Sequence, residues 1–431
     1  MDKQASILIL GAGTFGLSTA YHLAKAGYTN VTVLEKSATF PPELSAGNDL
    51  NKIIRAEYED PFYAELALEA MNAWKSPLFT PYYHETGYLL CNSAGAPEKS
   101  KISLQKSLDS IRQRPEFENK ITPVNSRDDI RKVAPAFDGP MLWKGYFNSY
   151  AGYAHAADAM TAVYSACIAL GVTIHLNSTV QNLTYSDSGD ICTGAMTTKG
   201  THYTASTTIL TLGASLASIL PQIKRQIIAK GSPVAHIQLT PREAAQLRGI
   251  PVTYARDLGF FFEPDVRTQQ LKLCPANAGY THYHHHHATS SGLLSLPPSD
   301  NSFVAARDEA AIRRLLRETL PELAERPLVG RRVCWCADTA DSEYVIDFVP
   351  GKKGLVVVTG DSAHAFKMLP TLGAWVREVL ERGRQDRERW RWKEGSDAAG
   401  VDISWRVGKT TDLQEVRDEI RRDEDAVEAK L

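Results

Sequence analysis

The sequence predicts an α/β fold, α+β over the whole chain, with a Rossmann-like nucleotide-binding domain built from discontinuous segments. A short apolar run at 6–10 leads directly into a glycine-rich turn at 11–16, the pattern of a buried parallel strand followed by a phosphate-binding turn. Further apolar runs lie far apart in the chain, at 172–176, 208–214 and 354–361. One nucleotide-binding sheet that gathers these distant strands would explain the layout.

The first unit has all the parts of a dinucleotide-binding βαβ motif. Gly11 permits a tight turn, Gly13 lets the backbone approach a pyrophosphate, and Gly16 lets the following helix pack on the strand. A second apolar strand at 31–34 ends at Glu35, which can accept a hydrogen bond from a ribose hydroxyl. We therefore predict that this unit binds a dinucleotide.

The rest of the chain is predicted to form a second layer that carries the substrate. Alternating residues at 234–240 and 260–263 indicate mainly antiparallel strands. Helices are expected at about 157–170 and 364–381, and the charged tail is expected to be a solvated helix or a frayed end. The predicted boundaries are 1–60, 151–221 and 336–395 for the nucleotide-binding domain, 61–150 and 222–335 for the substrate domain, and 396–431 for the tail.

The composition argues against several classes of protein. The chain has 431 residues, of which 43% are hydrophobic and 23% charged, and its net charge is -2. Without a strong positive charge, neither nucleic acid nor an anionic membrane is an expected partner. No apolar run approaches the roughly 20 residues of a membrane-spanning helix. With no secretory signal, the 6 cysteines are not expected to form disulfides, and no metal site is expected, since the run His284–His287 is interpreted as a polar loop.

Four ordered motifs resemble one class of flavoproteins. They are Ser45–Lys52 (S-A-G-N-D-L-N-K), Asp257–Pro264 (D-L-G-F-F-F-E-P), Cys334–Thr339 (C-W-C-A-D-T) and Gly360–Lys367 (G-D-S-A-H-A-F-K). Over most of its length the chain is similar to the D-amino-acid-oxidase-like flavoproteins. Within this class it resembles the branch of monomeric sarcosine oxidase, saccharopine oxidase and fructosyl amino acid oxidase (amadoriase). The resemblance implies an FAD-binding domain with a mainly antiparallel substrate domain over the flavin.

The resemblance also implies that FAD is held covalently. The spacing to Thr339 matches the family pattern when Cys334 forms a thioether to the isoalloxazine, and Cys336 is the alternative. The alternative is that neither cysteine binds FAD and that both are buried residues of the core. The residues expected to contact FAD are Gly11, Gly13, Thr14, Phe15, Gly16, Glu35, Lys36, Ser45, Asn48, Lys52, Val180, Gly213, Cys334, Asp361, Ala363, Phe366 and Lys367.

Cations at matching positions are expected to serve catalysis and substrate binding. By resemblance, Lys272 corresponds to the family lysine credited with oxygen activation, and Lys52 to a basic residue close to the flavin. Arg55 and Lys367 correspond to the pair that grips the substrate carboxylate in the sarcosine oxidase branch, a task that suits the planar guanidinium. At Ala276, fructosyl amino acid oxidases carry a glutamate and sarcosine oxidase a histidine, which counts against activity on fructosyl amino acids.

The predicted activity is therefore that of an FAD-dependent oxidase. It would convert a secondary amine bearing an α-carboxylate to an imine and reduce O2 to hydrogen peroxide. Saccharopine-like, N-alkyl and cyclic amino acids are the candidate substrates, and a fructosyl amino acid oxidase is the alternative. A flavin dehydrogenase that uses a quinone or carrier protein and a flavoprotein used only for binding are less favoured.

The C-terminal residues suggest a location in the cell. Ala429–Leu431 differs from the peroxisomal Ser-Lys-Leu address by one small residue. We therefore expect recognition by the peroxisomal import receptor, with a cytoplasmic location otherwise. By resemblance to the family, the protein is expected to be a monomer.

Overall fold

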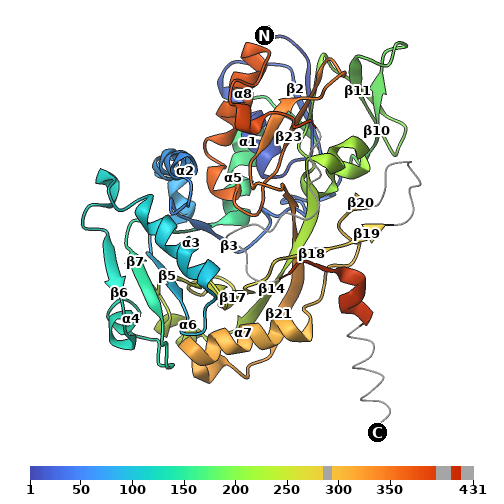
Figure 1. The fold of residues 1–431 in the computed structure, drawn as a ribbon. Helices are drawn as coiled ribbons and strands as arrows, with labels where there is room; N and C mark the ends of the chain where they lie inside the picture. Colours follow the sequence, from blue (N-terminus) through green and yellow to red (C-terminus); the bar gives the residue numbers. More distant parts are fainter. Residues whose placement is uncertain (285–293, 395–408, 419–431) are drawn as a thin grey trace.

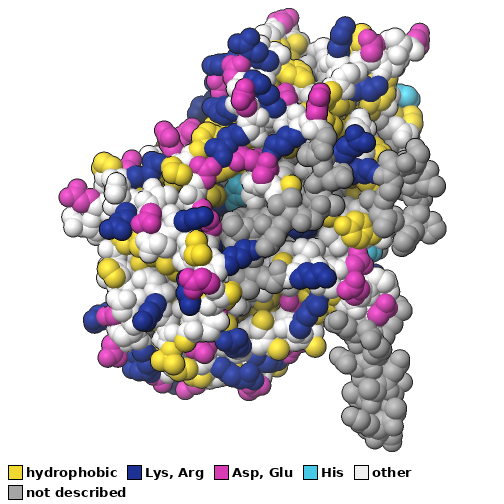
Figure 2. Space-filling view, viewed as in Figure 1, with side chains coloured by type: hydrophobic (Ala, Val, Ile, Leu, Met, Phe, Trp, Pro, Cys, Tyr) yellow, Lys and Arg dark blue, Asp and Glu magenta, His cyan; other side chains and the backbone are white. Residues whose placement is uncertain are grey.

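The computed structural model describes residues 1–284, 294–394 and 409–418 (Figure 1). Two large sheets dominate the fold, one in the upper part of the view with α1 and α8, and one in the lower part with α7. Figure 2 shows basic and acidic side chains interspersed over the face in view. None of the described helices is both long and apolar enough to cross a membrane.

The six-stranded sheet unites distant segments of the chain, as the sequence predicts. Its order is β22-β23-β13-β1-β2-β9, and only β22 runs antiparallel to its neighbour. The inner strands β1, β13 and β23 are buried along almost their whole length, because a parallel sheet is covered on both faces, whereas the outer strand β9 is partly exposed. The strands are β1 (Ile7–Leu10), β2 (Val31–Leu34), β9 (Thr173–His175), β13 (Thr207–Leu210), β22 (Val345–Phe348) and β23 (Leu355–Thr359).

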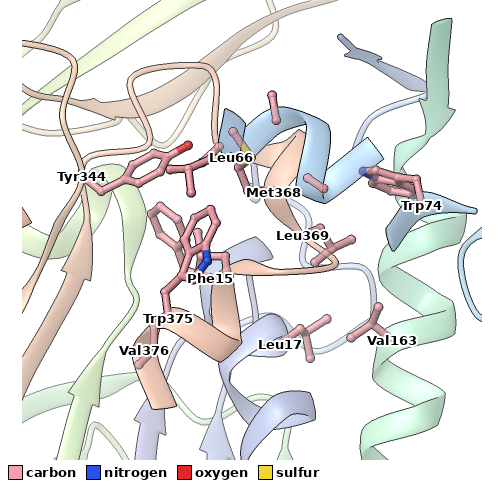
Figure 3. Packing of buried hydrophobic residues seen from close by; sticks show 14 of the residues in the cluster. Phe15, Leu17, Leu66, Trp74, Val163, Tyr344, Met368, Leu369, Trp375 and Val376 are labelled. Carbon is pink, nitrogen blue, oxygen red and sulfur yellow. The ribbon is translucent and has the colours of Figure 1, made fainter. Parts of the chain in front are cut away.

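Three helices pack against this sheet and against one another: α1 (Thr14–Lys25), α5 (Ala156–Ala169) and α8 (Leu372–Arg382). Figure 3 shows Phe15 and Leu17 of α1 in one buried cluster with Trp375 and Val376 of α8. The helices approach closely, because Ser18 Oγ donates to Leu369 O at 2.7 Å and accepts from Gly373 N at 2.8 Å.

The start of the last of these helices corrects a prediction. The helix expected at 364–381 begins at Leu372, and only a short 3-10 helix, Phe366–Met368, precedes it. Pro370 explains the delay, because it has no N–H to donate to a preceding carbonyl and so interrupts the helical hydrogen bonds.

The larger sheet has ten strands in the order β24-β18-β14-β17-β16-β15-β5-β7-β6, with β21 paired to β14. Most pairs are antiparallel, as predicted, and β15–β5 and β18–β24 are parallel. The strands are β5 (Tyr88–Asn92), β6 (Ile121–Val124), β7 (Lys144–Asn148), β14 (Ile228–Gln238), β15 (Val252–Ala255), β16 (Gly259–Phe261), β17 (Gln270–Pro275), β18 (Tyr280–Thr281), β21 (Leu328–Asp338) and β24 (Thr411–Asp412).

Helix α7 (Ala306–Thr319) covers one face of this sheet. Its Ile312, Leu315 and Leu316 pack in one buried cluster with Leu271 and Leu273 of β17. The opposite face of β17 is therefore free to serve the site. The other helices are α2 (Pro61–Trp74), α3 (Glu98–Asp109), α4 (Arg127–Val133) and α6 (Pro241–Gln246).

Three small sheets complete the described fold. In the sheet β3-β8-β4, Lys52 and Ile54 of β3 pair with Ala154 and Gly152 of β8. The exact division of the chain into domains stays a prediction. The strands are β3 (Asn51–Ile54), β4 (Tyr83–His84), β8 (Gly152–His155), β10 (Val180–Tyr185), β11 (Cys192–Thr197), β12 (His202–Thr204), β19 (Tyr283–His284) and β20 (Leu294–Ser295).

Part of the charged tail packs against the protein. Strand β24 pairs with β18, and Leu413 and Val416 are fully buried in a cluster with Tyr280 and Trp335. The expectation of a solvated helix or frayed end is thus wrong for residues 409–418, because two apolar side chains suffice to dock them. Ala429–Leu431 and most of the histidine run lie outside the described residues, and the described residues contain no cluster that could hold a metal.

The glycine turn after β1 generates a prediction about stability. A Cβ at Gly16 would lie 1.9 Å from Gly11 O, a backbone atom, whereas a Cβ at Gly13 would have only an ordinary contact with Ser45 Oγ at 3.5 Å. Gly16→Ala should therefore lower the free energy of unfolding by about 3 kcal/mol, and Gly13→Ala by less than about 1 kcal/mol. Urea unfolding of the two variants checks this, and equal losses would contradict it.

Candidate active site

A cavity of ≈ 1200 Å³ opens at the carboxyl ends of β1, β2 and β13. This is the end at which parallel sheets of this kind bind nucleotides. Gly16 and Lys367 of the predicted cofactor residues are not among those that line it, since Gly16 packs against Gly11 and Thr211. Those that line it are Gly11, Gly13, Thr14, Phe15, Glu35, Lys36, Ser45, Asn48, Lys52, Val180, Gly213, Cys334, Asp361, Ala363 and Phe366.

The glycine-turn end of the cavity fits a dinucleotide. Gly11 has a φ of 103°, which favours glycine, and α1 begins with no side-chain cap and no acidic residue in its first turn. Its N–H groups and positive dipole end can therefore serve a pyrophosphate. Glu35 Oε2 accepts from Ala12 N at 2.9 Å, and Oε1 accepts from Ser37 N at 2.9 Å. These bonds fix the carboxylate at the end of β2.

One buried carboxylate holds three cations, of which Lys52 and Arg332 line the cavity and Lys272 is not among the lining residues. Asp49 Oδ2 accepts from Lys272 Nζ at 2.5 Å and from Lys52 Nζ at 2.9 Å, and Oδ1 accepts from Arg332 at 2.7 Å. Lys272 also donates to Asn51 O at 2.7 Å. The Asp49 side chain is completely buried, and its partners come from β3, β17 and β21. We call Asp49, Lys52, Lys272 and Arg332 the Asp49 cluster.

Charge and burial compete within the Asp49 cluster. Burial alone would raise the pKa of Asp49, but Lys272, Lys52 and Arg332 hold it well below its ordinary value. Burial lowers the pKa of Lys272, and Asp49 only partly opposes this. For Lys52, burial lowers the pKa, but the attraction of Asp49 and Cys334 together with the hydrogen bond to Asp49 outweighs this effect, so the pKa is raised. The cluster thus places the positive charge of Lys52 and Arg332 at the cavity wall.

The two cysteines of the Cys-Trp-Cys motif have different surroundings. Cys334 is half-buried, lines the cavity, and has its Sγ 3.9 Å from Lys52 Nζ. Cys336 is buried, is not among the cavity-lining residues, and pairs with Lys230 of β14. A thiolate beside a lysine is the more reactive form of a cysteine. The position of Cys334 in the cavity, close to Lys52, therefore favours Cys334 over Cys336 as the reactive thiol.

The turn after β23 closes the cavity from the other side. Asp361 accepts from Ala337 N at 2.9 Å and from Ala363 N at 3.0 Å, and burial raises its pKa to about 6. Ser362 and Ala363 both have a positive φ, of 40° and 60°. The amadoriase pattern carries a glycine in place of Ala363, which is the residue type that this backbone favours.

The face of β17 that points away from α7 carries Lys272 of the Asp49 cluster. Lys272 lies over the ring of Phe262, with Nζ 5.1 Å from the ring centroid. Alternation along β17 places Cys274 on the same side as Lys272, and Ala276 follows two positions later. Ala276 N donates to Leu258 O at 3.0 Å. The predicted substrate contact at Ala276 thus lies just beyond the end of β17.

Arg55 and Lys367, the predicted carboxylate clamp, meet at Tyr58. The guanidinium carbon of Arg55 lies 5.1 Å from the centre of the Tyr58 ring, and Lys367 Nζ donates to Tyr58 Oη at 2.9 Å. Lys367 also donates to His364 O at 2.9 Å. Burial lowers the pKa of Lys367 well below its ordinary value. An anion placed between Arg55 and Lys367 would favour the charged form of Lys367.

Sequence reasoning missed several residues of the site. Asp49 stands inside a recognised motif, but its spacing to Lys272 and Arg332 carries no signal. Glu57 and Tyr58 follow Arg55 by two and three positions, and the burial of Glu57 is visible only in the fold. Arg332 had a usable signal, because it precedes Cys334 by two positions on one strand and so shares its face.

Comparison with known proteins identifies the class. Residues 6–379 match the DAO family, described as FAD dependent oxidoreductase, and the chain belongs to this family. The fold class and the resemblance predicted from the motifs are confirmed, and the protein is an FAD-dependent oxidoreductase.

Particular relatives match almost the whole chain. L-saccharopine oxidase of Schizosaccharomyces pombe is 33% identical over 427 residues, covering 93% of this chain and 95% of the relative. Amadoriase II, a fructosamine oxidase from Aspergillus fumigatus, has a TM-score of 0.85 and 34% identity, with 96% and 97% of the chains covered. Fructosyl peptide oxidase from E. terrenum has a TM-score of 0.89 and 32% identity, with 96% and 98% covered.

The Asp49 cluster generates a second prediction. Asp49→Asn leaves three cations without their counter-charge and should lower the free energy of unfolding by about 3–5 kcal/mol at pH 7. The pKa of Asp49 is depressed in the fold, so its contribution is present above about pH 4 and is lost as the pH falls further. Adding Lys272→Met should restore about 0.5–3 kcal/mol, because one unpaired cation is removed. Urea titrations of the single and double variants measure this coupling, and strictly additive losses would count against it.

Proposed function

We propose that the protein oxidises a secondary amine that bears an α-carboxylate, with saccharopine-like, N-alkyl and cyclic amino acids as candidates. The observation that carries the proposal is the pair of cations around Tyr58, a half-buried Arg55 and a buried Lys367. Two cations that are largely withdrawn from water call for an anionic partner, and a carboxylate matches the fork of an arginine. The names of the relatives agree, since L-saccharopine oxidase and N-methyl-L-tryptophan oxidase both denote enzymes for N-substituted amino acids.

The residues of the site divide the work of this reaction. A bound FAD would supply the redox chemistry, which is hydride acceptance from the carbon next to nitrogen and two-electron reduction of O2, with an imine and hydrogen peroxide as products, and Gly11, Gly13, Glu35 and Cys334 would hold it. Arg55 and Lys367 fix the carboxylate and with it the orientation of that carbon. Lys52 and Lys272 place positive charge where negative charge develops during oxygen reduction, and Asp49 holds both in position.

A covalent link to the cofactor is the second part of the proposal. Cys334 lines the cavity beside Lys52, and this supports a thioether from Cys334 to the flavin rather than from Cys336.

The location of the protein in the cell is the third part of the proposal. The Ala429–Leu431 ending supports import into peroxisomes by their receptor, and one relative is named peroxisomal sarcosine oxidase. We also propose that the protein is a monomer.

Fructosyl amino acid oxidation is the alternative, because the solved structures of such enzymes match the fold with TM-scores of 0.85 to 0.89. Ala276 argues against it. An alanine beyond the end of β17 offers no polar group to a sugar hydroxyl or a substrate amine.

A substrate panel distinguishes these activities. Under anaerobic conditions, saccharopine, pipecolate or an N-methyl amino acid should bleach the flavin absorbance, and air should restore it with release of hydrogen peroxide. A fructosyl amino acid should bleach it far more slowly. Bleaching by the fructosyl compound alone would make the protein an amadoriase, and slow recovery in air would make it a dehydrogenase.

The covalent link is tested by Cys334→Ser. Acid precipitation should leave flavin in the pellet of the wild-type protein and in the supernatant of this variant, because an alcohol cannot replace the thioether. Cys336→Ser is the matched control and should keep flavin in the pellet. The reverse pattern would move the link to Cys336.

A further inference from the structure

Glu57 is a buried carboxylate that no part of the proposed reaction yet uses. Its side chain lies in the loop after β3 and is 1% exposed. Glu57 Oε1 accepts from Asn148 Nδ2 at 2.7 Å, whereas Oε2 has no hydrogen-bond partner among the residues that the structure describes. An unpaired buried polar atom costs about 1–3 kcal/mol, so the position of Oε2 calls for a functional explanation.

Other unpartnered polar atoms surround Glu57. Arg55 Nη1 and the hydroxyls of Tyr88 and Tyr146 are also buried without a partner in the described part of the chain. Tyr88 pairs with Asn148 across β5 and β7, and Tyr146 stands two positions before Asn148, so their side chains share one sheet face. The guanidinium carbon of Arg55 lies 5.8 Å from the centre of the Tyr88 ring. These groups together fit a polar ligand with both donor and acceptor groups.

The negative charge of Glu57 suits it to a different part of the substrate from the part that Arg55 and Lys367 would bind. Burial raises the pKa of Glu57, while Arg55, the Asn148 amide and the backbone N–H groups of Glu57 and Ala56 oppose this. Arg55 and Lys367 are suited to a carboxylate, and Glu57 is suited to a cation. The titratable and charged groups that act on it or are acted on by it come from its own loop, β4, β5, β7 and the turn before α8: Arg55, Tyr58, Tyr83, Tyr88, Tyr146 and Lys367.

Oxidation of an amine requires a base that removes the proton from the substrate's ammonium group. A secondary amine has a pKa near 10, like that of lysine, so only about one molecule in 1000 is neutral at pH 7. The nitrogen lone pair must be free before the neighbouring C–H can leave as hydride. Since the nitrogen is bonded to the carbon that bears the carboxylate, fixing the carboxylate on Arg55 also fixes the nitrogen near residues of the same loop.

We propose that Glu57 Oε2 accepts the proton of the substrate's secondary ammonium, so that the amine is neutral when it is oxidised. The inference rests on the proposed function. In this step one N–H bond breaks and one O–H bond forms, no electrons change hands, and the proton passes to water after the product leaves. Glu57 is thereby a catalytic residue that touches the substrate, in addition to the clamp and the Asp49 cluster.

Stopped-flow reduction of the holoenzyme as a function of pH tests the proposal. With the substrate from the panel that bleaches the wild-type flavin, Glu57→Gln should reduce the flavin about 10²- to 10⁴-fold more slowly at pH 7. The rate should rise about tenfold per pH unit until the pH reaches the pKa of the amine, because only the neutral fraction then reacts. The variant should fold, since the glutamine oxygen can still accept from Asn148 Nδ2.

Two further variants keep the test decisive. Glu59→Gln removes the same charge two residues away, where the side chain accepts from Ser103, and should keep the wild-type profile. Glu57→Asp withdraws the base by one carbon and should slow reduction at pH 7 but not above the pKa of the amine. A wild-type profile in Glu57→Gln, or an unchanged rate at pH 7 in Glu57→Asp, overturns the inference. Failure of every carboxylate-bearing secondary amine to reduce the wild-type flavin overturns the proposed function instead.

Discussion

The attraction between one buried carboxylate and three cations is the constraint on which the site depends. Asp49 joins a loop that follows the nucleotide-binding unit to two strands of the large sheet, through Lys272 on β17 and Arg332 on β21. Without this counter-charge, burial would disfavour the charged form of Lys272 still further. The same contact therefore joins the loop before β3 to the large sheet and holds positive charge beside the cavity.

The site is also divided by charge along one sheet face. Positive groups gather near Lys272, and aromatic hydroxyls with a single carboxylate gather near Tyr88 and Tyr146. A substrate that carries both a carboxylate and an amine can be oriented by such a division without many direct contacts. Arg55 and Lys367, the proposed clamp, both contact Tyr58.

Local patterns were enough to predict the nucleotide-binding sheet, because glycines and apolar runs act over a few residues. The motifs also predicted which side chains line the cavity, from Gly13 to Cys334. Asp49 could not be predicted as a hub, since its partners lie up to 283 residues away in the chain. The late start of α8 required weighing Pro370 against an apolar pattern, and the docking of 409–418 depends on only two buried side chains, Leu413 and Val416.

The docked tail segment also changes the outline of the large sheet. An open sheet offers unpaired backbone groups at its outer strands, and another polypeptide can pair with them. At one border β24 contributes only two residues, Thr411 and Asp412, and at the other β6 carries Pro123, which has no N–H to offer. These two borders are thus poor templates for strand addition, and the third outer strand, β21, pairs with β14 alone among the described strands and lines the cavity through Arg332 and Cys334.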